Sequence, residues 1–298
     1  MMRVVDLFCG CGGLSLGFEL AGFNIVAAYD NWSAALNTYR RNFSHEARML
    51  DLKDVEQSVA TIAGDSPDMI IGGPPCQDFS SAGKRNGDNG RGDLTVCFAS
   101  IVSRLRPGWF VMENVERILK TDKLAQAKAL FWEAGYGMTQ AVLDASLCGV
   151  PQKRKRFFLI GAQGRPDGFL DAALRKGLAE KPMTVADYLG DSLGVEYYYR
   201  HPRSYARRGI FSIHEPSPTI RGVNRPVPQG YQVKPNDPVQ SVEGIRPLTT
   251  IERSYIQTFP PTYCFLGSKT EQEQMIGNAV PVNLARYVAS AIRACLYQ

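Results

Sequence analysis

Residues 4–21 read VVDLFCGCGGLSLGFELA, and this stretch decides the fold class. Its first five residues form a short apolar run typical of a buried strand, and the glycine-rich turn that follows leads into a helical pattern near residues 14–21. Residues 24–29 and 33–42 repeat the order of strand and then helix. Repeated units of this kind predict an α/β protein with a doubly wound, mostly parallel sheet and helices on both faces.

The same alternation continues to about residue 165. Further strands are predicted from the apolar runs at residues 68–71, 109–112 and 157–161, and helices are predicted near 94–105 and 122–134. From 166 to 245 proline and glycine become frequent and strand-like pieces are short, as at 195–199 and 231–233. We therefore expect a first domain over 1–165 and a small, irregular second domain over 166–245.

Helical periodicity returns after residue 245. Thr249 and Glu252 form a capping-box pattern ahead of an apolar run. Pro281 opens a last helix that runs to about Leu296, with an apolar stripe that includes Val288. We expect residues 246–298 to return to the first domain and complete it.

The composition is that of an ordinary globular enzyme, with 44% hydrophobic and 21% charged residues. No apolar run is long enough to span a membrane, and the first residues lead directly into a strand. The seven cysteines include no CxxC pair and no metal-ligand spacing with the three histidines. We expect reduced thiols in a cytoplasmic protein, with neither disulfides nor a metal site.

Positive charge is concentrated in residues 200–234, where seven of the 34 basic residues stand against Glu215 alone. Tyrosines surround this segment at 197, 198, 199, 205 and 231. Such a segment indicates a nucleic-acid footprint, although a solvated basic loop has the same composition.

The hexapeptide GGPPCQ, residues 72–77, follows the predicted strand at 68–71. Glycines permit a tight turn there, and Pro74 and Pro75 fix the backbone and prevent a helix, so Cys76 should project from a preset loop. A thiol held in this way suits a nucleophile. The alternative is a buried structural cysteine, which is the usual role of a free cysteine.

Two other segments lie at predicted strand ends. DLFCGCGG, residues 6–13, suits a nucleotide-type cofactor at a helix N-terminus, and Asp30 is placed to accept hydrogen bonds from ribose hydroxyls. Asp51 and Leu52 follow a possible third strand and could flank an adenine. Each carboxylate alone is more often a surface residue, and the turn alone is a weak signal.

Glu113 and Asn114 follow the strand at 109–112, so a carboxyl group and the Cys76 thiol should face one bound ring. In QKRKR, residues 152–156, strand alternation sends Gln152, Arg154 and Arg156 to one side and the two lysines to the other. A solvated basic edge is the alternative for this run.

Six segments, in this order, resemble the motifs of bacterial-type cytosine-C5 DNA methyltransferases: DLFCGCGG (6–13), GGPPCQDFS (72–80), ENV (113–115), QKRKR (152–156), RPLTTIERSYIQTFP (246–260) and IGNAVP (276–281). The resemblance covers 1–165 and 246–298. It implies the class I methyltransferase fold and places the family's target-recognition domain at 166–245.

The resemblance implies S-adenosylmethionine as cofactor, with S-adenosylhomocysteine as product. By analogy its pocket is lined by Phe8, Gly10, Cys11, Gly12, Asp30, Asp51, Leu52, Pro74, Leu94, Asn278 and Val280. The implied reaction adds the Cys76 thiolate to C6 of a flipped-out cytosine, methylates C5, removes the C5 proton and expels the thiolate. Arg154 and Arg156 would favour the thiolate and orient the base, Glu113 would stabilise charge in the ring, and Asn114 would hold its neighbours.

Double-stranded DNA is the expected substrate. Residues 78–92 look like a basic lid over the flipped base, in which Lys84, Arg85 and Arg91 would contact DNA. The alternative is a surface loop. In the recognition region the expected contacts to phosphates or guanine edges are Arg203, Arg207, Arg208, Thr219, Arg221 and Arg225.

Three positions depart from the family pattern. Ile251 and Tyr255 stand where many members carry arginine, which puts DNA contact or domain anchoring by this helix in doubt. Ala82 replaces a serine often seen in the lid, so it offers no side-chain plug.

Two other functions are compatible with these motifs. One is a tRNA cytosine-C5 methyltransferase, since a eukaryotic branch with the same motifs modifies RNA. The other is a cofactor-binding DNA-binding protein without catalysis, against which the intact Cys76, Glu113, Arg154 and Arg156 argue. We expect a monomer acting in the bacterial cytoplasm on nucleoid DNA, and the sequence leaves open whether a restriction endonuclease acts at the same site.

Overall fold

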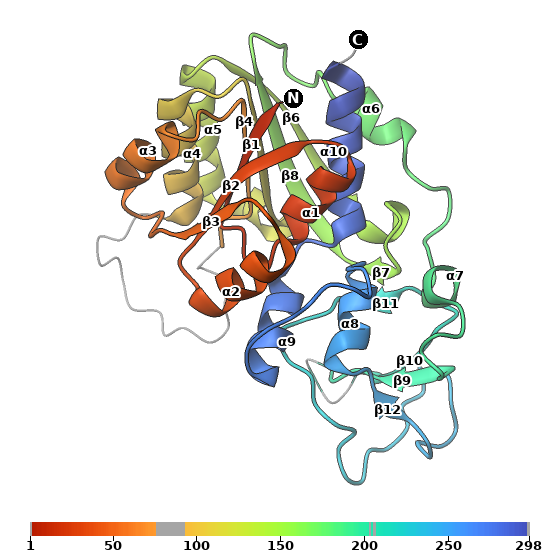
Figure 1. The fold of residues 1–298 in the computed structure, drawn as a ribbon. Helices are drawn as coiled ribbons and strands as arrows, with labels where there is room; N and C mark the ends of the chain where they lie inside the picture. The colour runs from red at the N-terminus through yellow and green to blue at the C-terminus, as the bar shows by residue number, and fades with distance from the viewer. Residues whose placement is uncertain (1, 76–92, 203, 205–206, 297–298) are drawn as a thin grey trace.

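The computed structural model describes residues 2–75, 93–202, 204 and 207–296. At its centre lies a seven-stranded sheet with the order β3-β2-β1-β4-β5-β8-β6 (Figure 1). Its strands are β1 (Arg3–Leu7), β2 (Asn24–Asp30), β3 (Glu46–Met49), β4 (Met69–Gly72), β5 (Trp109–Val115), β6 (Tyr136–Asp144) and β8 (Lys155–Gln163). Neighbouring strands are parallel except that β8 is antiparallel to both β5 and β6. The sheet is mostly parallel, as predicted.

Helices cover both faces of this sheet (Figure 1). One face carries α1 (Gly13–Leu20), α6 (Asp171–Lys176) and α10 (Val282–Leu296), and the other carries α3 (Val55–Ala63), α4 (Leu94–Leu105) and α5 (Asp122–Glu133). Asp54 caps α3 by accepting from the Gln57 amide, and Asp93 caps α4 by accepting from the Thr95 amide. This arrangement confirms the predicted doubly wound fold.

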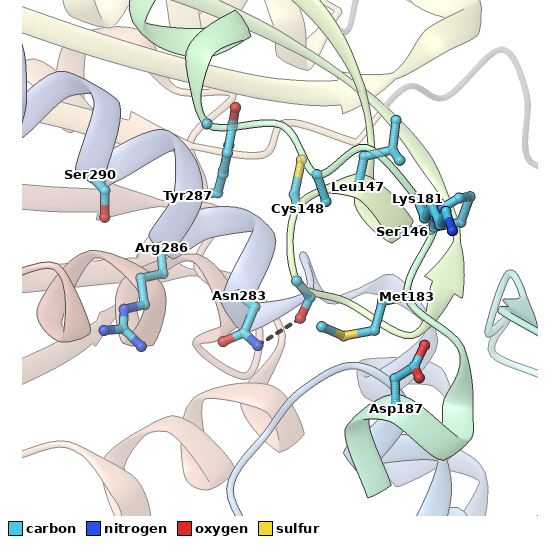
Figure 2. A pocket seen from close by; sticks show the side chains of 14 residues that line it. Ser146, Leu147, Cys148, Lys181, Met183, Asp187, Asn283, Arg286, Tyr287 and Ser290 are labelled. Atoms are coloured by element: carbon cyan, nitrogen blue, oxygen red, sulfur yellow. Dashed lines mark hydrogen bonds between the residues drawn. The ribbon is translucent and has the colours of Figure 1, made fainter.

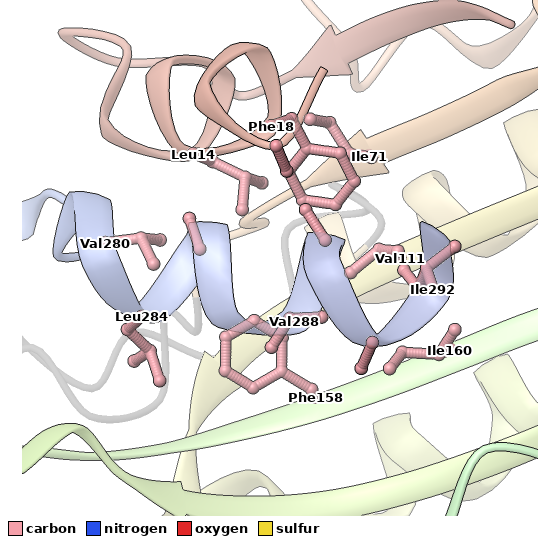
Figure 3. Close-up of a cluster of buried hydrophobic side chains, with 14 of the residues drawn as sticks. Leu14, Phe18, Ile71, Val111, Phe158, Ile160, Val280, Leu284, Val288 and Ile292 are labelled. Atoms are coloured by element: carbon pink, nitrogen blue, oxygen red, sulfur yellow. The ribbon is translucent and has the colours of Figure 1, made fainter. Parts of the chain in front are cut away.

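The last helix, α10, fills the core between α1 and the sheet (Figure 3). Leu284, Val288 and Ile292 form the predicted stripe and are completely buried. They pack with residues of α1, β4, β5 and β8, so a segment at the end of the sequence covers strands from its beginning. Burying each such side chain contributes about 2 kcal/mol.

A smaller part of the chain lies below the large sheet in Figure 1. It contains α7 (Val185–Leu189), β9 (Tyr197–Tyr199), β10 (Ile210–Ser212) and β12 (Arg246–Pro247), the three strands forming one small sheet. Here β11 (Ser217–Pro218) pairs with β7 (Gln152–Lys153), which joins this region directly to the QKRKR segment. The strand expected at 231–233 does not form: these residues are irregular and lie between turns at 229–230 and 235–236.

Three further helices share a hydrophobic core with residues of the smaller part: α2 (Ser33–Asn42), α8 (Thr250–Ile256) and α9 (Lys269–Asn278). The capping box predicted for Thr249 and Glu252 is present at the start of α8. Two short 3-10 helices, η2 (Glu116–Lys120) and η3 (Ala145–Leu147), follow β5 and β6. In the described ranges no helix has both the length and the apolar character needed to cross a membrane.

Candidate active site

A cavity of about 590 Å³ opens at the carboxyl ends of β1, β2, β4 and β5. Ligands of open α/β sheets bind at this edge, and the volume is in the usual range for a small-molecule site. The loop after β4, the turn after β1 and the end of α9 all contribute to its wall. Segments far apart in the sequence therefore meet at one site.

The turn after β1 has an unusual backbone. Phe8 has a φ of 59° and Gly10 a φ of 53°, in a region that non-glycine residues rarely adopt. Asp30, at the end of β2, holds this turn in place. Its Oδ2 accepts from the Gly10 amide at 2.8 Å, and its Oδ1 accepts from the Trp32 amide at 2.8 Å. Burial raises the pKa of Asp30, and these backbone donors oppose the rise.

Most of the predicted cofactor residues line this cavity: Phe8, Gly10, Cys11, Asp30, Pro74, Leu94, Asn278 and Val280. Gly12, Asp51 and Leu52 do not. Gly12 has a φ of 90°, and a side chain there would meet the Phe43 ring and the Tyr263 hydroxyl, so the close packing of the turn requires a glycine. Leu52 lies in the core, and exposed Asp51 accepts from the Lys53 amide.

Several residues of the cavity wall were not predicted. They include Asn31 and Trp32 beside Asp30, and Gln274, Met275 and Ala279 at the end of α9. The aromatic Trp32, two residues past the ribose-binding candidate, was a usable signal. Ala279 lies within the IGNAVP motif, whereas Gln274 and Met275 carried no such signal, because only the tertiary fold brings them to the cavity.

The carboxyl end of β5 places Glu113 and Asn114 against the loop after β4. Asn114 Nδ2 donates to the Pro74 carbonyl at 2.9 Å, and its Oδ1 accepts from the Val115 amide at 2.8 Å. A Cβ on Gly73 would lie 3.1 Å from Glu113 Oε2. Asn114 thus holds the prolines that precede Cys76. Cys76 itself lies outside the described residues.

Glu113 and Arg156 form an ion pair at the floor of the cavity. Arg156 Nε lies 2.8 Å from Glu113 Oε1, and both side chains are mostly buried. Oε1 nevertheless has no well-aligned hydrogen bond from the described part of the chain. Burial raises the pKa of Glu113, while Arg156 and Arg154 oppose the rise. The site therefore offers a carboxyl group that a ligand can engage, beside a fixed positive charge.

Arg154 does not line this cavity, although the strand alternation is as predicted. Gln152 and Arg154 are buried, whereas Lys153 and Lys155 are exposed. Arg154 Nη1 donates to the Ile220 carbonyl at 2.9 Å. Its Nη2 donates to two carbonyls at the end of α9, Gly277 at 3.0 Å and Ala279 at 3.1 Å. Its hydrogen bonds thus hold backbone in place, and it affects Glu113 only by a coulombic interaction, without a hydrogen bond.

A second cavity, of about 660 Å³, adjoins the first, and we call it the basic cleft. Its basic residues are Lys153, Arg154, Lys155, Arg156, Arg200, Arg207, Arg208 and Arg221. Val115, Arg156 and Asn278 line both cavities, so a group held over the cleft can reach Glu113. The predicted nucleic-acid segment thus borders the predicted chemical site.

The predicted DNA contacts differ in their surroundings. Thr219 Oγ1 donates to the Lys153 carbonyl at 2.7 Å, and Arg221 donates to the His201 carbonyl. Arg208 pairs with Glu215, and its guanidinium lies 4.2 Å from the centre of a phenylalanine ring. Arg207 and Arg225 are exposed. Four other predicted contacts lie outside the described residues: Lys84, Arg85, Arg91 and Arg203.

A third cavity, of about 560 Å³, lies between α10 and the segments that contain Cys148 and Met183 (Figure 2). Asn283 Nδ2 donates to the Gly149 carbonyl at 2.8 Å across its rim. Burial raises the pKa of the Cys148 thiol to about 12, which makes it unreactive at neutral pH. None of its lining residues lines either of the other two cavities.

The family model for C-5 cytosine-specific DNA methylases matches residues 2–294. The chain belongs to this family. It is 62% identical over 293 residues to the type II methyltransferase M.HindV of Haemophilus influenzae, covering 98% of this chain and 96% of that protein. It is 56% identical over 297 residues to M.HgiDI of Herpetosiphon aurantiacus, covering 100% and 96%. These findings confirm the family predicted from the motifs.

Solved structures of other methyltransferases share the fold. The Dnmt2 methyltransferase of S. pombe aligns with a TM-score of 0.73 and 16% identity, covering 100% of this chain and 99% of that one. EhMeth of Entamoeba histolytica aligns with a TM-score of 0.67 and 17% identity, covering 100% and 98%. The methyltransferase is thus a DNA (cytosine-5) enzyme with the class I fold, and its cofactor is S-adenosylmethionine.

The residues of the first cavity fit this cofactor. Each oxygen of Asp30 accepts one backbone hydrogen bond and keeps further acceptor capacity, which suits ribose hydroxyls. Trp32 and Leu94 offer apolar surface for an adenine ring, and the turn into α1 brings backbone close to the ligand. Asp30, Trp32 and Leu94 are therefore the residues most suited to hold the nucleoside part.

Proposed function

We propose that this enzyme methylates C5 of one flipped-out cytosine in a specific duplex DNA sequence, through a covalent bond between the Cys76 sulfur and cytosine C6. The main observation in support of this proposal is the Glu113–Arg156 ion pair, which lies where the cofactor cavity adjoins the basic cleft. S-adenosylmethionine supplies the electrophilic methyl group. Every other step falls to residues of this chain.

The pyrimidine ring must first become nucleophilic at C5. In this proposal the Cys76 thiolate adds to C6, and the new bond pushes an electron pair toward C5. C5 takes the methyl group, then loses its proton to a base, and the returning electron pair expels the thiolate. Asn114 supports the first step by fixing the Pro74 carbonyl, two residues before the thiol.

Glu113 is suited to form a hydrogen bond with the ring nitrogen N3 of the cytosine. Burial favours its protonated form, which can donate a hydrogen bond to N3 and stabilise the charge that develops in the ring. Arg156 is suited to the exocyclic O2 and to the thiolate, because its guanidinium stays charged inside the site. For Arg154 the contacts support a role in orienting backbone around the site rather than in touching the base.

The residues of the basic cleft support the proposed duplex substrate. Lysine and arginine side chains bind phosphates, and a cytosine removed from the stack has a short path from the cleft to Glu113. We place the recognition domain at 166–245, between a cofactor-binding domain over 1–165 and its completion over 246–298. Because β11 pairs with β7, residues of the recognition domain would be fixed to the catalytic one.

The test is methylation of duplex DNA that contains 5-fluorocytosine. Fluorine at C5 cannot leave as a cation, so the reaction should stop with the enzyme attached, and mass spectrometry should locate the bond on Cys76. Cys76→Ala should form no adduct but still bind the cofactor. An adduct on another residue, or turnover by the alanine variant, would refute the proposed nucleophile.

The same purified enzyme can be used to identify the DNA sequence that it methylates. Unmodified genomic DNA and tRNA are each incubated with the enzyme and labelled cofactor, and 5-methylcytosine is mapped by bisulfite sequencing. We expect one short duplex motif and no label on tRNA. Label on tRNA alone would favour the RNA-modifying alternative.

We also propose that a restriction endonuclease of the same specificity is its partner, since both relatives above are named type II methyltransferases. DNA methylated at the mapped motif should then resist an endonuclease that cuts there. The enzyme would act as a monomer on nucleoid DNA in the cytoplasm, because one active site suffices for one flipped base. Sedimentation with and without duplex checks the monomer.

A further inference from the structure

A buried arginine connects α8 to its surroundings. Arg253 is 4% exposed and pairs through Nη1 with Glu273 Oε2 on α9. Its Nη2 donates to the Arg221 carbonyl and lies 3.4 Å from the Val223 carbonyl. The other oxygen of Glu273 accepts from Thr250 Oγ1 at 2.9 Å. One guanidinium therefore joins α8, α9 and the backbone of residues 221–223.

Residues 219–223, which we call the recognition segment, lie directly on α9. A side chain at Gly277 would collide with the Gly222 amide and the Arg221 carbonyl carbon. A Cβ on Gly222 would lie 3.2 Å from the Gln274 Cα. The two backbones are in contact, so a small movement of one displaces the other.

Residues of α9 that meet the recognition segment also line the cofactor cavity. Gln274, Met275 and Gly277 contribute to that wall, and Asn278 borders both the cavity and the basic cleft. The recognition segment and the cofactor cavity thus share α9 as a common support. Arg253, on α8, holds the recognition segment against α9.

Arg253 lies between two positions of α8 that depart from the family pattern. In the resemblance described above, many members carry arginine at the positions of Ile251 and Tyr255. Here Ile251 is 40% exposed, and the arginine of this helix stands between those positions. The structure supplies the anchoring contact that the departures at 251 and 255 put in doubt.

We propose that Arg253 and Glu273 form a positioning pair that sets the recognition segment against the target-base site and so determines affinity and discrimination for the DNA sequence. The proposal rests on the proposed function, in which the basic cleft, lined in part by Thr219 and Arg221, binds the duplex. Neither Arg253 nor Glu273 touches the reacting atoms. A buried ion pair adds little net stability, so positioning and stability can be separated experimentally.

The main variant is Arg253→Met combined with Glu273→Leu, which replaces the pair by apolar side chains of similar length. It should fold with a melting temperature close to wild type, because no unpaired charge stays buried. Its KM for cognate duplex should rise about tenfold, the effect of losing one hydrogen bond from a charged group. Discrimination against duplexes with one changed base pair should fall by a similar factor, whereas kcat should stay near wild type.

Arg253→Lys provides a second, single variant. Lysine keeps the charge that faces Glu273 but lacks the planar fork that also reaches the Arg221 carbonyl. It should therefore change KM and discrimination in the same direction. Ile251→Ala is the matched control on the same helix, with an exposed side chain, and should behave as wild type.

The outcomes are distinguishable. Wild-type KM and discrimination in either folded variant would overturn the proposal. If the double variant melts well below wild type, the lysine variant alone decides. Wild-type enzyme that methylates no duplex DNA would instead refute the proposed function, and the positioning role would fall with it.

Discussion

Buried polar residues in this methyltransferase serve to orient backbone as much as to react. Arg154 donates to three carbonyls from two parts of the chain, and Gln152 Nε2 donates to Gln257 Oε1 at 2.7 Å in the same region. Gln257 in turn donates to the Ile276 carbonyl at 2.6 Å. Such networks specify one arrangement of loops because each unsatisfied group would be costly.

Asp6 gives a prediction about pH at the residue scale. It is completely buried, accepts from Ser15 Oγ at 2.6 Å, and burial raises its pKa from 3.8 to about 8. Its contribution to stability is thus present below about pH 4 and lost as the pH rises to about 8. In that window the slope is at most about 1.4 kcal/mol per pH unit. Asp6→Asn should remove this slope, as measured by urea unfolding at several pH values.

The control for Asp6 is Asp191→Asn, at an exposed position. This variant should keep the wild-type pH dependence. Parallel stability curves for wild type and Asp6→Asn would show that Asp6 titrates normally in the folded protein.

Sequence alone placed the residues proposed for the chemistry better than the residues that hold the backbone around the site. Glu113 and Asp30 could be placed because they lie at the carboxyl ends of predicted strands, which share one edge of the sheet. Arg156 precedes its strand and was placed by the alternation within QKRKR. Spacing alone did not show that Arg154 and Gly12 would lie outside the wall of the first cavity, since an arginine in a strand pattern or a glycine in a turn has the same sequence whether it faces a ligand or a neighbour. Trp32 was missed although it adjoins Asp30.

At the element scale, the contact between α1 and α10 depends on a glycine. A side chain at Gly17 would collide with Ala285 and lie 2.6 Å from the Val282 carbonyl. Gly17→Ala should therefore destabilise the enzyme by about 3 kcal/mol, the cost of overpacking a filled core. Equilibrium denaturation measures this free energy directly.

Gly64→Ala is the comparison for Gly17. Gly64 has a φ of −62°, and an added Cβ would only reach the Thr61 carbonyl at 3.4 Å. Its stability should change by no more than about 1 kcal/mol, in the stabilising direction, because alanine lowers the entropy of the unfolded chain. Equal losses in both variants would mean that helix contact is not the cause.

Elements with strong local signals were predicted almost to the residue, as for α2, α4 and α10. The strand β6 was missed because its burial alternates irregularly and its sequence, YGMTQAVLD, contains no continuous apolar run. The antiparallel direction of β8 was also beyond prediction, since direction depends on the connection through η3 and β7 rather than on residues 155–163 themselves. Long-range pairing has no local signature.

At the scale of the whole molecule, the charge distribution governs binding to the duplex. Arg207 and Arg208 are adjacent and both line the basic cleft. Arg208 is already paired with Glu215, whereas Arg207 is exposed and has no ion pair with the described residues. Arg207→Ala should lower the slope of log affinity against log salt by about 1, as expected for one phosphate contact.

Arg208→Ala is the matched neighbour and should leave that slope unchanged. Fluorescence anisotropy with a cognate duplex at several salt concentrations measures both slopes. A salt slope that falls for Arg208→Ala but not for Arg207→Ala would reverse the assignment of the two residues.

The position of α10 has a consequence for synthesis in the cell. Val4 and Phe18 leave the ribosome long before residues 282–296, which make the surface that covers them. The nascent chain must hold an uncovered apolar sheet face until those residues emerge, a state prone to aggregation and to chaperone binding. The wall of α9 residues that closes the cofactor cavity also arrives late. Methylation can thus begin only after translation of these segments, which separates synthesis of the enzyme in time from its first action on the genome.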